Sequence, residues 1–325
     1  MTDNEEYWIG FDLGGTKMLS AAFDSQLSLL SREKKRTKAN EGDKAVIERI
    51  INSIEEVLEK SELTESSLSG IGIGVPGTID LEDGVVVEAP NLGWEDVKLK
   101  KILSDRFECE VVLCNDVDAG LYGEYACGSA KGVHCSVGVF PGTGVGGGCV
   151  IDGKLLQGRR RTAMEVGHVQ LYSGGPMDGA ENVGTLETIS SRLAIAAASA
   201  QAVFRGAAPN LKEMAGTDLS AVRSGVLANA IKKGDKSIEA IVKHATTYLG
   251  VMVVNLIHLF SPDLVVLGGG LAEAMPELIV KGTRKYVQDH VLKSFHGTYE
   301  IVEAELGDDA AIIGAAAWAK ESIAK

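Results

Sequence analysis

Residues 7–23 read YWIGFDLGGTKMLSAAF and place a glycine pair between two apolar segments. The segments at residues 7–11 and 18–23 each have the length and composition of a buried strand. Two such strands around a glycine turn predict a hairpin. Because glycine has no side chain, backbone N–H groups in the turn can approach an anion closely. The opening of the chain therefore predicts a hairpin whose turn can hold phosphate.

The same pattern returns later in the chain. Residues 135–140 predict a strand, residues 141–148 read PGTGVGGG and predict a glycine turn, and residues 149–151 predict a second strand. This repeat predicts two related lobes, with a boundary near Asn115. We expect a smaller α/β lobe from residues 1–115 with 305–325, and a larger α/β lobe from residues 116–304.

The remaining segments mix helical and strand patterns. Apolar residues recur at helical spacing over residues 45–60, and short apolar runs predict strands at residues 71–75 and 111–114. Helices are also predicted at residues 119–125, 193–204, 237–260 and 310–325, and a strand at residues 264–267. Mixed elements of this kind indicate an α/β chain.

A third glycine turn, Gly268-Gly269-Gly270, follows the strand at residues 264–267. None of the three turns matches the P-loop pattern or the dinucleotide motif that opens a helix. A single glycine turn is most often only a tight turn. Three turns at strand ends, two of them carrying Thr16 or Thr143, weaken that interpretation and favour phosphate binding.

Composition limits the classes of partner. The 325 residues include 32 Lys and Arg and 45 Asp and Glu, for a formal net charge of −13. Such an acidic chain disfavours nucleic acid and anionic membranes. The basic run Arg159-Arg160-Arg161 is interpreted as a solvated loop. The best membrane-span candidate, residues 249–260, is shorter than the ~18 residues that a span needs.

Cysteine usage and the first residues indicate a cytoplasmic protein. The chain has five cysteines, and none forms a Cys-x-x-Cys pair. The N-terminal MTDNEE segment is acidic and polar, unlike a secretory leader. We therefore expect reduced thiols and a cytoplasmic location.

Asn115-Asp116 follows directly on a predicted apolar strand. A carboxylate there can accept the proton of a sugar hydroxyl as its oxygen attacks phosphorus. Asp is also a favoured helix cap, so the residues alone leave catalytic base and cap as equal alternatives.

Other polar residues suit sugar hydroxyls. Glu165 and His168 lie three residues apart, Glu187 follows, and Asn91 precedes Trp94. Carboxylates, amides and imidazoles can each bond to hydroxyls, which both donate and accept hydrogen bonds. Taken singly, such residues are usually ordinary surface groups.

Several motifs occur in an order that resembles the ROK family of bacterial sugar kinases and sugar-responsive repressors. They are DLGGTK at residues 12–17, Pro76-Gly77, Asn115-Asp116, the turn at residues 142–148 and Glu165-x-x-His168. The resemblance covers essentially the whole chain. It implies a two-lobed actin/hexokinase-like (ribonuclease H-like) ATPase fold. Pro90-Asn91-Leu92-Gly93-Trp94 resembles the glucokinase branch more than the repressor branch.

The resemblance implies ATP-dependent phosphorylation of a hexose at its primary hydroxyl, most simply glucose to glucose 6-phosphate, a step of glycolysis. ATP and Mg²⁺ are implied, with Asp116 as catalytic base and Asp12 orienting the ion through water. The implied hexose ligands are Asn91, Asn115, Asp116, Glu165, His168 and Glu187. The implied ATP-binding residues are Asp12, Gly14, Gly15, Thr16, Lys17, Gly142, Thr143, Gly144, Gly146, Gly268, Gly269 and Gly270. The family also suggests a homodimer.

Alternatives stay open. N-acetylmannosamine, fructose or allose could replace glucose, and the Arg159–Arg161 run keeps polyphosphate open as a phosphate donor. The main rival is a sugar-sensing ROK regulator lacking its DNA-binding domain. Only 11 residues precede Asp12, too few for a helix-turn-helix domain.

Two departures from the family pattern concern the loop around His168. The family usually has Ala-Gly-Glu where this chain has Ala163-Met164-Glu165, so Met164 can alter the presentation of Glu165.

The second departure concerns metal. Many relatives follow their Gly-His pair with three cysteines that hold a structural zinc together with the histidine. The aligned positions here are Asp178, Ala180 and Thr185. Structural zinc needs four ligands, mostly thiolate and imidazole. We therefore expect no structural zinc, solvated side chains at Asp178, Glu181 and Asn182, and His168 acting only as a sugar ligand.

Overall fold

The computed structural model describes residues 6–159 and 163–323. Contacts divide the chain into two compact units. Unit 1 comprises the described residues of Met1–Gly132, Gly153–Ala163 and Asp308–Lys325, and unit 2 comprises Val133–Asp152 and Met164–Gly307. The first division thus follows Gly132, whereas the sequence suggested one near Asn115. Arg160 and Arg161, on which the polyphosphate alternative depends, lie outside the described residues.

Unit 1 is built on a five-stranded sheet with the order β3-β2-β1-β4-β8. Its strands are β1 (Tyr7–Leu13), β2 (Lys17–Phe23), β3 (Leu29–Arg36), β4 (Leu68–Val75) and β8 (Val111–Asn115). β1 and β2 form the predicted antiparallel hairpin, and β3 extends it. β4 and β8 join in parallel on the other side of β1.

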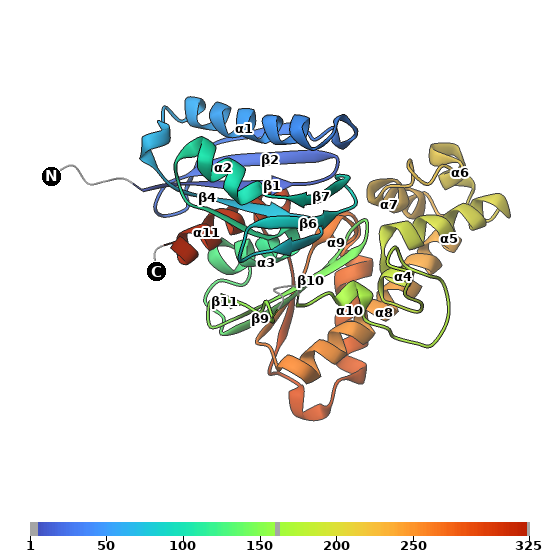
Figure 1. Cartoon of the computed structure of the whole chain (residues 1–325). Helices are drawn as coiled ribbons and strands as arrows, with labels where there is room; N and C mark the ends of the chain where they lie inside the picture. The colour runs from blue at the N-terminus through green and yellow to red at the C-terminus, as the bar shows by residue number, and fades with distance from the viewer. Residues whose placement is uncertain (1–5, 160–162, 324–325) are drawn as a thin grey trace. The chain divides into compact units, whose positions relative to one another are not determined.

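Helices cover both faces of this sheet (Figure 1). α1 (Asp43–Lys60) and α2 (Leu99–Phe107) lie on one face. α1 is amphipathic, and it buries Val46, Ile50 and Ile54 at helical spacing, which explains its formation. α3 (Asp116–Cys127) and α11 (Ala310–Ile323) pack against the opposite face.

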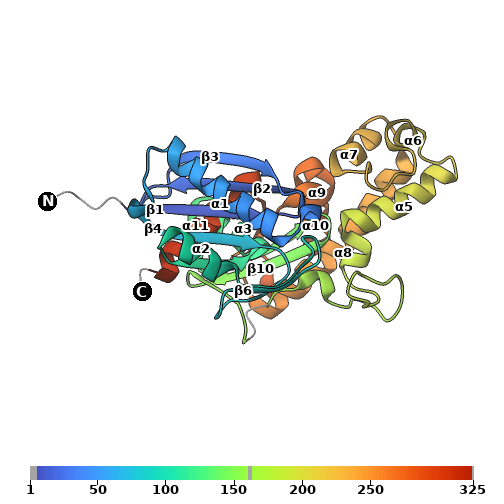
Figure 2. The same ribbon diagram turned by 45° about the horizontal axis from the view of Figure 1, so that its top comes forward.

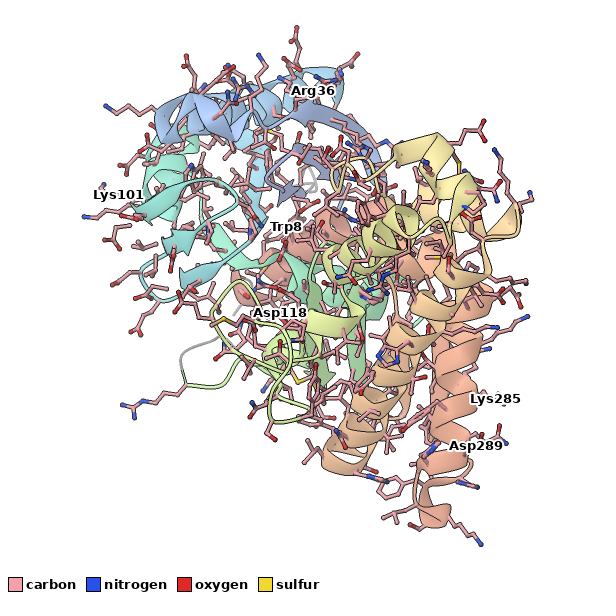
Figure 3. All side chains as sticks on the ribbon, turned by 90° about the vertical axis from the view of Figure 1, so that its right-hand side faces the viewer. Trp8, Arg36, Lys101, Asp118, Lys285 and Asp289 are labelled. Carbon is pink, nitrogen blue, oxygen red and sulfur yellow. The ribbon has the colours of Figure 1, made fainter. Side chains whose placement is uncertain are left out.

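Glycines in the sheet let α11 approach closely. A Cβ atom on Gly72 would lie 1.9 Å from the backbone oxygen of Ala315, so no larger residue fits there. Next to this contact, Trp8 of β1 is 2% exposed and packs with Ile312 of α11 (Figure 3). The small residues of α11 therefore form part of the core.

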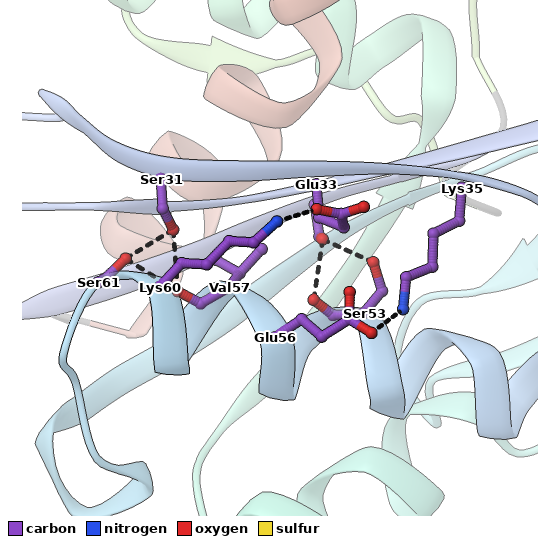
Figure 4. A network of polar contacts seen from close by, with 9 residues as sticks. Ser31, Glu33, Lys35, Ser53, Glu56, Val57, Lys60 and Ser61 are labelled. Carbon is purple, nitrogen blue, oxygen red and sulfur yellow. Dashed lines mark hydrogen bonds and ion pairs between the residues drawn. The ribbon is translucent and has the colours of Figure 1, made fainter.

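Polar contacts join β3 to α1 along the exposed edge of the sheet (Figure 4). The Ser31 and Ser61 hydroxyls lie 2.6 Å apart, and Lys35 pairs with Glu56 at 2.7 Å. Lys60 also pairs with Glu33. These contacts pair Lys35 and Glu33 of β3 with residues of α1.

Shorter elements complete unit 1. β5 (Thr78–Asp80), β6 (Val85–Ala89) and β7 (Trp94–Val97) form a three-stranded antiparallel sheet that the sequence did not predict. The remaining elements are η1 (Ala39–Glu41), η2 (Glu65–Ser67), β11 (Lys154–Leu155) and η5 (Gly307–Asp309).

Unit 2 repeats the arrangement of unit 1. β9 (Cys135–Pro141) and β10 (Val145–Ile151) form an antiparallel hairpin. β12 (Leu264–Leu267) pairs in parallel with β9, and β13 (Glu300–Glu303) pairs in parallel with β12. The predicted repeat of strand, glycine turn and strand is confirmed. The predicted end of the turn at Gly148 is wrong, because residues 145–148 already belong to β10.

The helices of unit 2 include two long ones, α8 (Lys236–Phe260) and α10 (Pro276–His290), that pack together (Figure 2). α8 has the length and mean hydropathy, 1.4, of a membrane span, but 56% of that segment is buried inside the protein. Its apolarity is thus that of a core helix. α10 buries Ile279, Thr283 and Val287, while Lys285 and Asp289 lie on its exposed face (Figure 3).

The other elements of unit 2 are short or lie beyond the sheet. They are η3 (Val166–His168), α4 (Glu187–Ser190), α5 (Arg192–Phe204), α6 (Pro209–Ala215), α7 (Ser224–Lys232), α9 (Gly269–Ala274) and η4 (Lys293–Phe295).

Candidate functional site

In unit 1 the predicted acidic residues lie on β1 and directly after β8, the two parallel strands that flank β4. Asp12 of β1 pairs in register with Gly74 of β4, and Val75 pairs with Asn115 of β8. A Cβ atom on Gly74 would lie 3.3 Å from the Cα atom of Asp116. The absence of a side chain at Gly74 thus keeps this strand edge open beside the two carboxylates.

The electrostatics of this edge are unfavourable for two negative charges. Desolvation raises the pKa of Asp12 to about 7, and the charge of Asp116 adds to this effect. Lys17 acts in the opposite direction. The buried Asp12 beside the charge of Asp116, only partly balanced by Lys17, favours the binding of a cation.

Asn115 takes the capping role that the sequence left open for Asp116. Asn115 is the N-cap of α3, and its side-chain oxygen accepts hydrogen bonds from the backbone N–H groups of Val117, at 2.9 Å, and Asp118, at 3.3 Å. Asp116 is the first residue of the helix and accepts from Val117 N at 3.0 Å. The helix dipole at this position favours its anionic form. The cap is therefore mainly the work of Asn115.

The first glycine turn is closed by its own backbone, with Gly14 N donating to Lys17 O at 3.0 Å. The buried Thr37 braces it, since its hydroxyl donates to Gly14 O at 2.5 Å and its N–H to Thr16 O at 3.0 Å. The sequence gave no sign of this brace, because Thr37 lies 23 residues from Gly14.

Two predicted ligands flank this turn. A Cβ atom on Gly15 would lie 2.9 Å from the backbone oxygen of Asn91, so the turn lies against the exposed Asn91. The Lys17 ammonium pairs with Asp308 at 2.8 Å, and both side chains are substantially exposed. In unit 1, Asn91 thus lies against the first glycine turn, and Lys17 at the end of that turn forms an ion pair with Asp308.

In unit 2 the second glycine turn is tighter than predicted. Gly142 N donates to Gly144 O at 2.8 Å, and Thr143 lies between them. Arg192, the first residue of α5, donates from its guanidinium to the Thr143 hydroxyl at 3.0 Å and from its backbone N to Gly142 O at 2.9 Å. Sequence reasoning missed Arg192, whose only signal was a lone arginine opening a predicted helix.

Glu187 lies against the same turn. Its Oε2 accepts a hydrogen bond from Val145 N at 2.9 Å. A Cβ atom on Gly144 would lie 2.2 Å from that oxygen. The structure thus brings a predicted sugar ligand and a predicted nucleotide loop into direct contact.

The segment predicted as a third glycine turn is instead the start of α9, with Gly268 as its N-cap. It packs on β9, the strand that leads into the second glycine turn. A Cβ atom on Gly269, which has a φ of +78°, would lie 3.0 Å from the backbone oxygen of Pro141. A Cβ atom on Gly268 would lie 2.7 Å from the Phe140 ring. Gly269 therefore permits close approach to the backbone at Pro141, and Gly268 permits close packing of the Phe140 side chain within unit 2.

Glu165 and His168 are held by the short helix η3, for which Glu165 is the N-cap residue. Burial raises the pKa of Glu165, and the charge of Glu187 adds to this while His168 opposes it. For His168, desolvation opposes the charged form, but the hydrogen bond with Asp178 and the nearby carboxylates outweigh it and raise the pKa. The three predicted sugar ligands of unit 2 are therefore electrostatically coupled.

Asp178 differs most from expectation. Its side chain is 0% exposed, so the predicted solvated surface is wrong for this residue. It accepts hydrogen bonds from His168 and from its own loop, because the buried carboxylate needs several donors. Among the described residues, no group of three or more His, Cys, Asp or Glu side chains could hold a metal ion.

Comparisons with known proteins agree with this geometry. The ROK family model matches residues 8–322. A glucokinase from Thermotoga maritima is 35% identical over 97% of this chain and 98% of that protein. A xylose repressor from Caldicellulosiruptor bescii is 27% identical over 94% of this chain and 76% of the repressor. A solved ROK family glucokinase from Streptomyces griseus, in complex with glucose and AMPPNP, has a TM-score of 0.83 at 26% identity over 97% of this chain and 99% of that one. These likenesses confirm the predicted α/β fold of the actin/hexokinase-like class and support a sugar kinase.

Proposed function

We propose that this chain, which belongs to the ROK family, transfers the γ-phosphoryl group of ATP to the primary hydroxyl of a hexose, with glucose as the first substrate. The observation that carries the proposal is the placement of Asp12 on β1 and of Asp116 directly after β8, the two strands that flank β4, beside a glycine turn. The 35% identity to a glucokinase supports glucose over other hexoses.

Asp116 is proposed as the catalytic base. Asn115 supplies the main cap of α3, and Asp116 takes the first helical position beside it, where the helix N-terminus favours a negative charge. Phosphoryl transfer depends mainly on positioning and charge stabilisation, because its transition state is largely dissociative. A base in this reaction contributes roughly 10²- to 10⁴-fold in rate.

The residues at this edge fit a magnesium ion. Mg²⁺ prefers oxygen ligands and binds through one or two carboxylates together with water and substrate phosphates. Asp12 supplies such a carboxylate, and the negative charge of Asp116 nearby also favours a cation. When bound, the ion neutralises charge on the phosphates. Asp12 would orient it, and the turns at residues 14–16 and 142–144 would hold the phosphate oxygens.

The predicted sugar ligands are proposed to bond hexose hydroxyls. They are Asn91, Asn115 and Asp116 in unit 1, and Glu165, His168 and Glu187 in unit 2. Burial raises the pKa of Glu165, and the hydrogen bond with Asp178 and the nearby carboxylates raise the pKa of His168. Carboxyl and imidazole groups both offer partners for hydroxyls. We also propose that the protein acts in the cytoplasm as a homodimer.

A sugar-responsive regulator is the second candidate, because the 27% identical xylose repressor aligns with 94% of this chain. An ADP-release assay with Mg-ATP across glucose, N-acetylmannosamine, fructose and allose separates the two. Rapid ADP release with one hexose supports the kinase. Tight hexose binding by calorimetry without ADP release would favour the regulator.

The catalytic assignment is tested with Asp116→Asn. We expect a 10²- to 10⁴-fold loss of turnover with the fold intact. The matched control is Asp105→Asn on α2, an exposed carboxylate paired with Lys101, which should keep full activity. Near-normal turnover of a well-folded Asp116→Asn variant would contradict the role of Asp116.

A further inference from the structure

The loop between His168 and Glu187 is organised around one buried carboxylate. Asp178 Oδ2 lies 2.9 Å from His168 Nδ1 and accepts from the Thr185 hydroxyl at 3.1 Å. Its Oδ1 accepts from the backbone N–H groups of Ala180 and Asn182, both at 2.9 Å. The side chain is 0% exposed. Because a buried carboxylate without partners is strongly unfavourable, these contacts fix the shape of the loop.

The loop is also closed by its backbone around this carboxylate. Asp178 N donates to Asn182 O at 2.8 Å, and Leu186 N donates to Val169 O at 3.1 Å. Isolated bridges pair Met177 with Val183. The chain between His168 and Glu187 therefore folds back on itself, and its backbone hydrogen bonds fix the position of Glu187 relative to His168.

A zinc ion does not fit these residues. The positions aligned with the zinc-binding cysteines of many relatives are Asp178, Ala180 and Thr185, and all three join His168 in the same hydrogen-bonded cluster. Only one imidazole and one carboxylate could ligate a metal there, whereas structural zinc takes four protein ligands. The residues at the positions of the zinc ligands are therefore joined by hydrogen bonds.

We propose that Asp178 is a positioning residue that organises the His168 loop in place of a metal ion and fixes the orientation of the His168 ring. An ionised carboxylate can only accept hydrogen bonds, so Nδ1 of His168 must carry the proton that it shares with Asp178. Nε2 is then the ring nitrogen presented to a ligand. This inference rests on the proposed function, in which that ligand is a hexose hydroxyl.

The first test is Asp178→Asn, with Glu181→Gln as the matched control. Glu181 is exposed and belongs to the same loop. Each carboxylate oxygen of Asp178 accepts two hydrogen bonds, and asparagine replaces one of these oxygens by an NH₂ group that cannot accept. We therefore expect the hexose KM to rise about tenfold or more, as for the loss of a hydrogen bond to a charged group. The KM for ATP should change much less, and the control should match the parent protein.

Nitrogen NMR of the His168 ring in the ligand-free protein gives an independent readout. We expect the Nδ1–H form in the parent protein and in Glu181→Gln, and a loss of that preference in Asp178→Asn. An unchanged ring signal in Asp178→Asn would overturn the inference. If the ring signal changes while hexose binding does not, the assignment of His168 as a sugar ligand fails instead.

A gain-of-function variant keeps the inference testable if Asp178→Asn does not fold. Combining Asp178→Cys, Ala180→Cys and Thr185→Cys supplies three thiolates around His168. We expect this triple variant to bind one zinc ion per chain and to lose hexose affinity on chelation, whereas the parent protein binds none and resists chelation. Near-stoichiometric zinc in tag-free parent protein, lost together with activity on chelation, would overturn the proposal.

Discussion

Replacing Gly144 by alanine should damage sugar binding through Glu187, although Gly144 lies in a loop proposed to hold ATP. A Cβ atom there would lie 2.2 Å from Glu187 Oε2, and real Cβ atoms essentially never come within 3.0 Å of a heavy atom. The carboxylate must therefore move by at least about 0.8 Å. That shift breaks or weakens its hydrogen bond with Val145 N, now 2.9 Å long.

The size of the effect follows from the displaced carboxylate. A hydrogen bond to a charged group contributes roughly 1.5–3 kcal/mol, which corresponds to about 10- to 150-fold in affinity. We expect Gly144→Ala to weaken hexose binding by a factor in this range. The same substitution should also weaken binding of a non-hydrolysable ATP analogue, since the loop itself has to adjust.

Gly142→Ala provides the matched control. It lies in the same turn, and a Cβ atom there would meet nothing within 4 Å. Calorimetry with the hexose alone should therefore give the parent affinity for Gly142→Ala and a reduced affinity for Gly144→Ala. Equal hexose affinities for the two folded variants would refute the proposed link between Glu187 and the sugar.

The remaining predictions concern stability and metal. Gly72→Ala should destabilise unit 1 by about 3 kcal/mol or more in denaturant unfolding, because the Cβ atom would clash with the backbone of α11. The control Gly120→Ala in α3 should be neutral or stabilise by about 0.5–1 kcal/mol, because its Cβ atom meets nothing within 4 Å. Equal effects of the two substitutions would contradict the packing of α11. The pKa of Asp12 is raised from 3.8 to about 7, so the free energy of unfolding of the parent protein falls as pH rises between these two values. Asp12→Asn should therefore be more stable than the parent at pH 8 and equal to it below about pH 4. A constant difference across this range in thermal unfolding would refute that coupling. Removing Mg²⁺ should abolish turnover and leave the circular dichroism spectrum unchanged; activity without any divalent ion would contradict the proposed role of Asp12.

Much of the fold follows from local sequence, because its central strands are uniformly apolar. The hairpin at residues 7–23 and the strand at residues 264–267 were predicted for this reason. α10 was not predicted, since only a narrow stripe of it is buried and most of its residues are polar. The sheet of β5, β6 and β7 was missed because its strands have three to five residues and several exposed side chains.

Glycine misled the prediction in one place. Residues 146–148 were assigned to a turn, but they lie in β10. The reason is close packing: a Cβ atom on Gly147 would lie 2.7 Å from the Val166 side chain. A glycine needed for close approach within a strand has the same letter as one needed for a turn, so sequence alone does not separate them.

The predicted site residues at strand ends could be found because a strand end is a local feature. Asp12 and Asn115-Asp116 each follow an apolar run. The contacts of Thr37 with Gly14, of Arg192 with Thr143 and of Asp178 with His168 join residues 23, 49 and 10 positions apart in the chain, which no local pattern reveals. The interpretation of Asp178 as solvated failed for that reason, because its four donors meet only after the loop has folded.

Met164 adopts a backbone conformation that glycine accepts more freely than methionine does. Where relatives have glycine, this residue adopts a φ of +69°, a left-handed conformation that glycine accepts freely and that costs other residues about 1–2 kcal/mol. The conformation is held by contacts that do not depend on the side chain: Val166 N donates to Met164 O at 2.7 Å, and Gly147 of β10 leaves room for that oxygen. The backbone that presents Glu165 is therefore set by the packing of η3 on β10. Any effect of Met164 on sugar choice must come from its side chain, because the turn itself already has the conformation that a glycine would give it.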